Sequence, residues 1–498
     1  MFKKILVANR GEIAVRVLRA CKELGIPTVT VYSEADRNAL HVRYGDEAYC
    51  IGEPPSTESY LKIEKIVDVA KKCGAEAVHP GYGFLAENTL FAKRCEKEGI
   101  TFIGPSSRAI KLLGDKTAAR KTMSNAGIPI VPGTEKGLTD EKDAMRIGLK
   151  LGFPLMIKAA GGGGGKGMRI VKKKEELKSA IKTAMAEAGS AFGDPRIYFE
   201  RYLINPRHIE FQILADSYGN VVHLCERECS IQRRHQKMIE ESPSCIMTPE
   251  LRKRMGEIAC KVVLTCNYTN AGTVEFLVDK DKNFYFLEMN TRLQVEHPVT
   301  ELVTGVDIVK EQIHISAGEK LTLKQKDVSI RGAAIECRIS AEDPYNNFMP
   351  SSGKIMQLVE PSGPGVRVES GIFEGFEVPI LYDPLIAKLL TWGRDRNEAI
   401  ARMKRALSEY RIYGIKTTIP FHLHVMDNDS FISGKYDTGF VEKLSFERGG
   451  RTQDEIAAIA AVIYATKQQK QVTIQKRGKG YNLWKMAGRV GFKGQWHT

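Results

Sequence analysis

The chain has 498 residues, 43% of them hydrophobic and 27% charged, a composition typical of a globular protein with several cores rather than of one compact domain. No stretch approaches the roughly 18 consecutive apolar residues of a membrane span, and the start, MFKKILVANR, lacks a signal-peptide core, so we expect a cytoplasmic protein without a membrane span. The formal net charge of +14 does not indicate nucleic acid, because about half of the excess follows Arg451 and no aromatic-studded basic groove is present.

The first hundred residues predict a small parallel sheet wrapped by helices, because short apolar runs alternate with helical patterns. The expected strands are Ile5–Ala8, Thr28–Tyr32, Ala77–Val78 and Thr101–Ile103, and the expected helices include Ile13–Cys21, Ile63–Lys71 and Phe91–Cys95. The turn after the first strand, Asn9 to Glu12, has one glycine where a dinucleotide fingerprint needs three. This argues against a nicotinamide enzyme.

The pattern changes further along the chain, and we predict an α/β and α+β protein of several domains. A second region mixes helices with hairpins, and a third combines short strands with helices such as Arg396–Tyr410. A basic extension follows, with an Ala/Ile-rich helix at Asp454–Ala465 and two tryptophans. The predicted limits are 1–114, 115–330, 331–446 and 447–498.

Five consecutive glycines, Gly161–Gly165, lie between the strand-like run Phe153–Lys158 and Lys166. A backbone without Cβ atoms can approach phosphate oxygens and turn its N–H groups toward them. The stretch is not a P-loop, because Ala160 and Gly167 stand where that motif needs glycine and Ser/Thr. We expect a mobile lid that orders over a nucleotide. A flexible linker is the alternative.

A predicted hairpin brings two acidic residues together. We centre its turn between Asp281 and Lys282. This register places Glu275 opposite Glu288, with Asn290 on the same face. Opposed carboxylates repel, and hard oxygen ligands suit a magnesium ion that holds nucleotide phosphates. A slip in register would instead send the two acids to separate solvated sites.

The same alternation continues through Arg292, Gln294 and Glu296. A planar oxyanion such as bicarbonate fits this face, because Arg292 can bind it in a bidentate manner and Glu296 can act as a general base. An ion-pair ladder at a sheet edge is the alternative.

A basic alternation precedes the hairpin, at Arg233, His235 and Lys237. It can supply positive charge to phosphate oxygens during a transfer step. A solvated basic strand would have the same pattern.

Together these motifs make about residues 1–446 resemble the biotin carboxylase family of the ATP-grasp superfamily. The matching segments stand in family order at Ala8–Ala14, His79–Phe84, Gly161–Gly165, Gln232–Lys237 and Glu288–Pro298. The resemblance implies a Rossmann-like N-terminal domain, a central ATP-grasp domain with a glycine-rich lid over about residues 132–203, and a C-terminal mixed α+β domain.

The resemblance also implies roles for individual residues. It assigns the ATP site to Lys116, Lys158, Gly163, Gly164, Gly165, Lys166, Glu200, Leu203, His208, Gln232 and His235. It assigns Mg²⁺ or Mn²⁺ to Glu275, Glu288 and Asn290, and bicarbonate to Lys237, Arg292, Gln294, Val295 and Glu296. Arg338 matches the arginine that stabilises enolised biotin.

The implied reaction is ATP-dependent carboxylation of biotin. Glu296 deprotonates bicarbonate, which attacks the γ-phosphate and gives carboxyphosphate. Released phosphate then takes the proton from biotin N1, and N1 captures carbon dioxide. Another ATP-grasp ligase that acts through an acyl phosphate is the alternative, and Arg292 to Glu296 with Arg338 favour biotin.

Biotin is expected on a partner chain. The only match to a biotinylation motif is Trp484-Lys485-Met486, which lacks its first methionine and the surrounding domain. The expected partners are a biotin carboxyl carrier protein and a carboxyltransferase, and the family implies a homodimer. The residues do not distinguish acetyl-CoA from pyruvate as final acceptor. Residues 451–498 are either a docking element or a solvated tail.

Overall fold

The computed structural model describes residues 1–134, 136–161, 168–446 and 462. The chain divides into two compact units, Met1–Phe446 and Glu447–Thr498. Among the described residues, none of the helices is both long and apolar enough to span a membrane. The helix predicted at Asp454–Ala465 lies outside the described residues apart from Val462.

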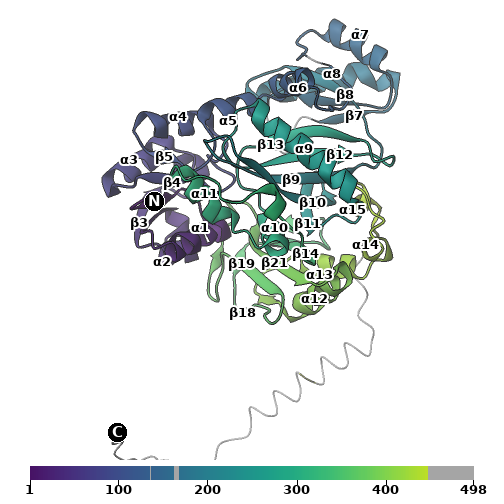
Figure 1. The fold of residues 1–498 in the computed structure, drawn as a ribbon. Coiled ribbons are helices and arrows are strands. Elements are labelled where there is room, and N and C mark those ends of the chain that lie inside the picture. The colour runs from purple at the N-terminus through teal and green to yellow at the C-terminus, as the bar shows by residue number, and fades with distance from the viewer. Residues whose placement is uncertain (135, 162–167, 447–461, 463–498) are drawn as a thin grey trace, which may run out of the picture. The chain divides into compact units, whose positions relative to one another are not determined.

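The N-terminal region forms a five-stranded sheet in the order β3-β2-β1-β4-β5, and every strand pair is parallel. Its strands are β1 (Ile5–Val7), β2 (Thr28–Ser33), β3 (Glu47–Gly52), β4 (Ala77–His79) and β5 (Thr101–Phe102). Its helices are α1 (Gly11–Glu23), α2 (Leu40–Tyr44), α3 (Ile63–Cys73), α4 (Thr89–Lys97) and α5 (Ser107–Gly114), purple in Figure 1. The predicted parallel sheet is confirmed.

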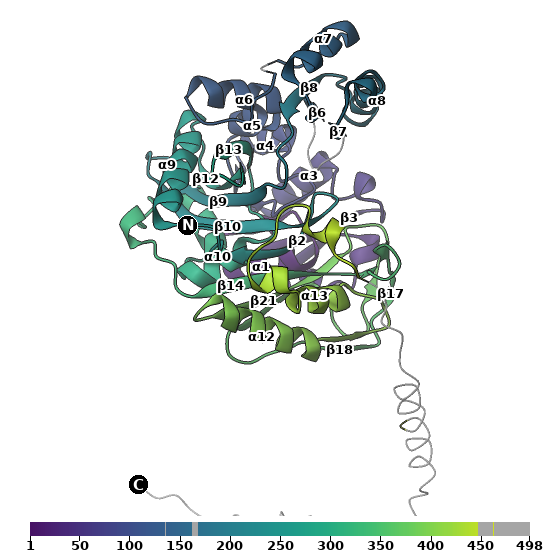
Figure 2. The same ribbon diagram turned by 90° about the vertical axis from the view of Figure 1, so that its right-hand side faces the viewer.

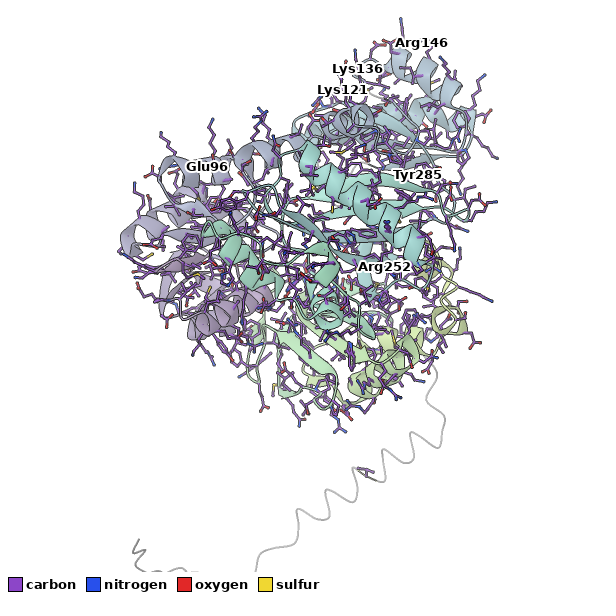
Figure 3. The ribbon with its side chains drawn as sticks, viewed as in Figure 1. Glu96, Lys121, Lys136, Arg146, Arg252 and Tyr285 are labelled. Carbon is purple, nitrogen blue, oxygen red and sulfur yellow. The ribbon has the colours of Figure 1, made fainter. Side chains whose placement is uncertain are left out.

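A small antiparallel sheet in the order β7-β6-β8 follows, blue in Figure 1. It contains β6 (Leu155–Ala159), β7 (Arg169–Val171) and β8 (Ile197–Arg201), with α6 (Lys116–Asn125), α7 (Glu141–Leu151) and α8 (Lys174–Phe192) nearby. Apolar side chains of α7 and α8 pack on the sheet. Exposed Lys121 on α6 and Arg146 on α7 project outward (Figure 3).

An eight-stranded antiparallel sheet forms the middle of the molecule, in the order β13-β12-β9-β10-β11-β14-β21-β19. Figure 2 labels β13, β12, β9, β10, β14 and β21 in this succession. Its strands are β9 (Arg207–Ala215), β10 (Val221–Arg233), β11 (Gln236–Ser242), β12 (Asn270–Val278), β13 (Phe284–Asn290), β14 (Ala333–Ser340), β19 (Val366–Ser370) and β21 (Leu385–Gly393). Because β11 pairs with β14, strands on both sides of the predicted limit at 330 share one sheet. The domain limits stay a prediction.

The two faces of this sheet differ in polarity. Alternate residues of β9 and β12, including Phe211 and Phe276, pack with α9 (Pro249–Thr265) in one core. Further along, β14 and β21 contribute to a second core with α12 (Arg396–Glu409) and α13 (Ile419–Met426). The intervening residues of the strands, such as Glu210 and Glu275, are buried and charged. Helix α10 (His297–Thr304) packs against β14 and β21.

Candidate active site

A row of four charged residues crosses the polar face of the large sheet. Arg227 lies opposite Glu210, Glu210 opposite Glu275, and Glu275 opposite Glu288. Side chains in directly opposed positions are close neighbours, so three adjacent acids repel one another. The row therefore requires cations, and the surrounding residues supply several.

The pairing of Glu275 with Glu288 was predicted from the sequence and is confirmed, although the register beside the turn differs. There Leu277 lies opposite Tyr285, one residue away from the predicted partner. A bulge between Glu275 and Phe276 then shifts the register, which restores the predicted acidic pair. Bulges of this kind re-aim side chains beside functional sites.

Lys237 joins three of the buried acids. Its Nζ donates to Glu210 Oε2 at 2.5 Å, to Glu275 Oε1 at 2.8 Å and to Glu296 Oε1 at 2.7 Å. Burial favours the neutral amine, but the three carboxylates outweigh it and raise the pKa of Lys237 well above its usual value. Lys237 is therefore a permanent cation at the centre of the row.

Glu296 is a fully buried acid held by two cations. Besides Lys237 on Oε1, Arg338 donates to its Oε2 at 2.9 Å. Burial by itself would raise the pKa of Glu296, but the charges of Lys237 and Arg338 outweigh it and hold that pKa well below its usual range. Glu296 is ionised at neutral pH.

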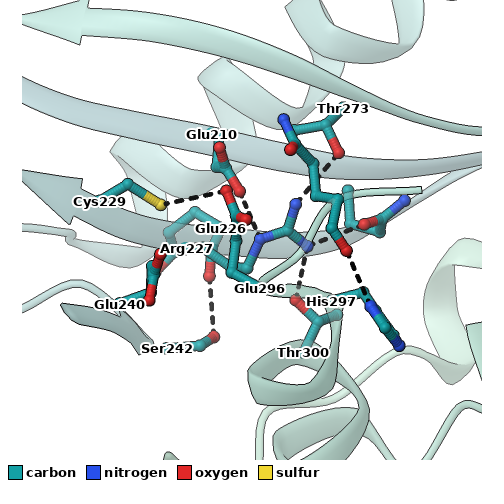
Figure 4. Close-up of polar contacts among 12 residues, drawn as sticks. Glu210, Glu226, Arg227, Cys229, Glu240, Ser242, Thr273, Glu296, His297 and Thr300 are labelled. Atoms are coloured by element: carbon teal, nitrogen blue, oxygen red, sulfur yellow. Dashed lines mark hydrogen bonds and ion pairs between the residues drawn. The ribbon is translucent and has the colours of Figure 1, made fainter. Parts of the chain in front are cut away.

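Arg227 contributes buried hydrogen bonds to this site, and Figure 4 shows its contacts with Glu210, Thr273 and Thr300. Its guanidinium is fully buried and donates to Glu210 Oε1 at 2.5 Å. It also donates to Thr273 and Thr300, at 3.0 Å each. Since all of these groups are buried, Arg227 fixes the orientation of Glu210 toward Lys237.

The segment from Arg292 to Glu296 is not a continuation of the strand, which corrects the predicted alternation. Strand β13 ends at Asn290, and Glu296 is the N-cap of α10. The side chains nevertheless converge, because Arg292 donates to Gln294 Oε1 at 2.8 Å and Gln294 donates to Glu275 at 3.2 Å. Tertiary contacts, and not a period of two, bring them together.

A residue of the N-terminal region holds this segment. Glu87 Oε2 accepts from Arg292 Nε at 3.0 Å, and its Oε1 accepts from the Thr291 N–H at 2.9 Å. Glu87 was not predicted from the sequence, and only its place shortly after the His79–Phe84 motif could have drawn attention to it.

The basic alternation at residues 233–237 is corrected by the structure. A hairpin turn separates β10 from β11, and its two residues, Arg234 and His235, have φ angles of +50° and +65°. Arg233 instead donates to the Asn347 carbonyl at 2.7 Å, in the C-terminal region. Of the three predicted basic residues, Lys237 reaches the acidic row, while His235 is exposed in the turn.

Several of the residues assigned to ATP lie around the same face. Lys116 Nζ is 3.2 Å from Glu288, and Lys158 pairs with buried Glu200, which also binds Arg120. His208 contacts Gln232 at 2.7 Å and Glu275 at 2.9 Å. Leu203 is partly buried after β8. Gly163, Gly164, Gly165 and Lys166, with the lid closure predicted for them, lie outside the described residues.

The third region reaches the site through Arg338 and Lys388. Lys388 Nζ donates to the Val295 carbonyl at 2.8 Å. Lys388, Arg227 and Glu210 were not predicted from the sequence. Two of them had a signal in the sequence. Lys388 is a single lysine inside the apolar run Leu385–Leu390, and Glu210 belongs to an alternation of His208, Glu210 and Gln212 with apolar residues.

The residues present fit a magnesium ion. Glu275 and Glu288 occupy facing register positions, and Asn290 donates to Glu275 at 2.8 Å. Two carboxylates with an amide oxygen beside them are the hard ligands that Mg²⁺ prefers. Glu288 is partly exposed, which leaves room for water and phosphate oxygens.

Family models match nearly all of the described unit. The model for the biotin carboxylase N-terminal domain matches residues 1–110, and that for the biotin carboxylase C-terminal domain matches 336–443. Between them, the model for the ATP-binding domain of the carbamoyl-phosphate synthase L chain matches 115–324. The chain belongs to the biotin carboxylase family.

Individual relatives agree with this family. A pyruvate carboxylase subunit from Methanothermobacter thermautotrophicus is 59% identical over 90% of this chain and 91% of its own. Biotin carboxylase 1 of Bacillus subtilis is 55% identical over 89% of this chain and 98% of its own. The biotin carboxylase domain dimer of Hydrogenobacter thermophilus 2-oxoglutarate carboxylase, solved with MgADP, ADP and bicarbonate, has a TM-score of 0.87 and 52% identity, over 89% of this chain and 98% of that one.

Proposed function

We propose that this biotin carboxylase family member uses ATP and bicarbonate to carboxylate biotin, which gives N-carboxybiotin, ADP and phosphate. The observation that carries the proposal is Glu296, a buried and ionised acid between Lys237 and Arg338. Glu296 can take a proton from bicarbonate that is bound beside Lys237, and Arg338 can stabilise the charge that develops on biotin. The bound MgADP and bicarbonate of the Hydrogenobacter structure support the assignment.

ATP binds between the polar face of the large sheet and the small antiparallel sheet. Lys116 and Lys158 neutralise phosphate oxygens, and each now pairs with an acid, Glu288 and Glu200. Glu200, near the end of β8, and Leu203, shortly after it, contact the adenine. His208, Gln232, His235 and the glycines 163–165 with Lys166 complete the nucleotide site.

Glu275, Glu288 and Asn290 would hold magnesium. When bound, the ion neutralises charge on the phosphate oxygens. Lys237 donates to Glu275 at 2.8 Å and neutralises part of the negative charge of the acidic row. A metal ion held by these residues would neutralise more of that charge.

Bicarbonate binds against Arg292, Gln294 and the backbone at Val295. Glu296 takes its proton, although the two cations make it a weak base in the substrate-free protein. Bicarbonate beside Lys237 competes with Glu296 for that cation, which raises the basicity of the acid where it is needed. A bicarbonate oxygen then attacks the γ-phosphate, and ADP leaves.

The carboxyphosphate breaks down to carbon dioxide and phosphate. Phosphate accepts the proton of biotin N1, and Arg338 stabilises the negative charge that develops on the ureido oxygen. N1 then forms the new bond to carbon dioxide. Arg338 lies 2.9 Å from Glu296, so the formation of carboxyphosphate and the carboxylation of biotin take place in one site.

We propose a separate biotin carboxyl carrier protein, a separate carboxyltransferase, and a homodimer like that named for the Hydrogenobacter domain. The carboxyltransferase would choose the final acceptor. Residues 451–498, outside the described part apart from Val462, would contribute to assembly.

Phosphate release from ATP with magnesium and bicarbonate, measured with and without free biotin, tests the reaction. Turnover that biotin stimulates, and that Arg338→Ala abolishes, is the expected result. Turnover indifferent to both biotin and bicarbonate would favour a different ATP-grasp ligase and contradict the proposal.

A further inference from the structure

The segment between β13 and α10 is held by its backbone carbonyls. It is neither helix nor strand, so its buried carbonyls need donors from elsewhere. Three carbonyls accept from residues close in sequence, namely Leu293 from Arg292, Gln294 from His297, and Glu296 from Val299. The Val295 carbonyl instead accepts from Lys388, which is 93 residues away.

Lys388 is placed by the sheet beside the arginine of the site. On β21 it lies opposite Arg338 of β14, and its side chain is fully buried. Both residues therefore point from the same face toward the start of α10. Arg338 contacts the side chain of Glu296, whereas Lys388 contacts the peptide that precedes it.

The planarity of the peptide bond connects Lys388 to Glu296. The Val295 carbonyl and the Glu296 N–H lie in one plane, so fixing the carbonyl also fixes where the chain enters Glu296. We propose that Lys388 is a positioning residue that orients Glu296 and the Val295 backbone for bicarbonate. This inference rests on the proposed function, because it gives Glu296 the role of base.

The geometry favours this role over that of a simple countercharge. Lys388 is also near a buried acid, Glu12 of α1, but the distance from Nζ to Oε2 is 3.4 Å. Its contact with the Val295 carbonyl is shorter, at 2.8 Å. The two contacts can be separated by mutation, because within the described residues neither carboxylate oxygen of Glu12 forms a hydrogen bond to the segment.

Lys388→Met keeps the length and apolar stem of the side chain and removes its donor. In biotin-stimulated phosphate release by the full chain, we expect kcat/KM for bicarbonate to fall about 10- to 100-fold, since small displacements of a reacting group are costly. The KM for bicarbonate rises, while the KM for ATP is unchanged. If Lys388→Met only lowers the fraction of active protein, kcat will fall while both KM values stay at their wild-type level. That result would overturn the proposal.

Three further proteins complete the test. Glu12→Gln keeps the bond to Val295 and should keep the wild-type KM for bicarbonate, so a rise equal to that of Lys388→Met would overturn the proposal. If Lys388→Met does not fold, Glu12→Gln/Lys388→Met removes the acid in ion-pair distance of Lys388, while Glu336 and Glu369 remain, and it is compared with Glu12→Gln. Lys404→Met, at an exposed position of α12, is the control.

Failure of the wild type to depend on bicarbonate would reject the proposed function itself, whatever the variants do.

Discussion

Arg338 of β14 donates to Glu296 Oε2 at 2.9 Å, and the same arginine donates to Glu240 of β11 at 2.7 Å. The base proposed for bicarbonate is thus bound to the residue proposed for biotin. Substrates that occupy this site must exchange these contacts for their own. In the substrate-free protein, the proposed base and the arginine proposed for biotin neutralise one another.

Glu87 is expected to hold Arg292 in place for bicarbonate. Its carboxylate is 3.0 Å from Arg292 Nε and is partly exposed, so the pair contributes only about 0.2–1 kcal/mol. Glu87→Gln should therefore raise the KM for bicarbonate about 2- to 5-fold, with the KM for ATP unchanged. Steady-state kinetics measure both, with the exposed Glu34→Gln as control. Equal changes in the two KM values would contradict a specific effect on Arg292.

Glu288 is expected to set the affinity for magnesium. Glu288→Gln removes one of two facing carboxylates, so the magnesium concentration for half-maximal activity should rise by about 10-fold or more. Excess magnesium should restore part of the turnover. The matched control is Asp281→Asn, at the exposed tip of the same hairpin. An unchanged magnesium titration in Glu288→Gln would show that the metal binds elsewhere.

The buried acid Glu12 should make stability depend on pH. Burial raises its pKa from 4.5 to about 7, against the opposing charge of Lys388. The folded state then binds more protons than the unfolded state between these values, so the contribution of Glu12 to stability falls as pH rises through this window. The cost above pH 7 is about 3 kcal/mol.

Glu12→Gln removes this cost. The melting temperature of the variant relative to the wild type should therefore increase from pH 5 to pH 8, whatever constant offset the exchange of a carboxyl for an amide adds. Thermal unfolding at several pH values measures the slope, and Glu409→Gln on the exposed side of α12 is the control. A difference that does not vary with pH would mean that Glu12 titrates at its ordinary value.

Removal of residues 451–498 is expected to leave the chemistry intact. Every residue assigned to the site precedes Phe446. The truncated protein should keep biotin-stimulated turnover on free biotin but bind the carrier and carboxyltransferase chains more weakly. Size-exclusion chromatography of the mixed chains tests this. Assembly equal to that of the full chain would show that the extension is not a docking element.

Local patterns in the sequence were enough for the parallel sheet and for the pairing of Glu275 with Glu288. Both depend on short-range periodicity and on one turn. The turn at Arg234 and His235 was missed because neither residue is a usual former of a two-residue hairpin turn with positive φ. The predicted alternation of Arg233, His235 and Lys237 was therefore continued through a turn at which the chain reverses direction.

Long-range partners could not be derived in the same way. Glu87, Arg227 and Lys388 act on the site from three different regions, and no local period connects them to Glu296. The resemblance to a family assigned individual residues to ATP, metal, bicarbonate and biotin. It did not reveal which buried charges hold those residues, since that depends on the tertiary packing of charges in a dry interior.

The attack of bicarbonate on the γ-phosphate is tested most directly by the fate of its oxygen. With freshly dissolved ¹⁸O-bicarbonate, unlabelled ATP and free biotin, the wild-type protein should release phosphate that carries one labelled oxygen, because the P–O bond formed in the attack survives when carbon dioxide departs. Glu296→Gln should release phosphate about 100-fold or more slowly. Phosphate without label would mean that water, and not bicarbonate, attacks ATP, and would contradict the mechanism.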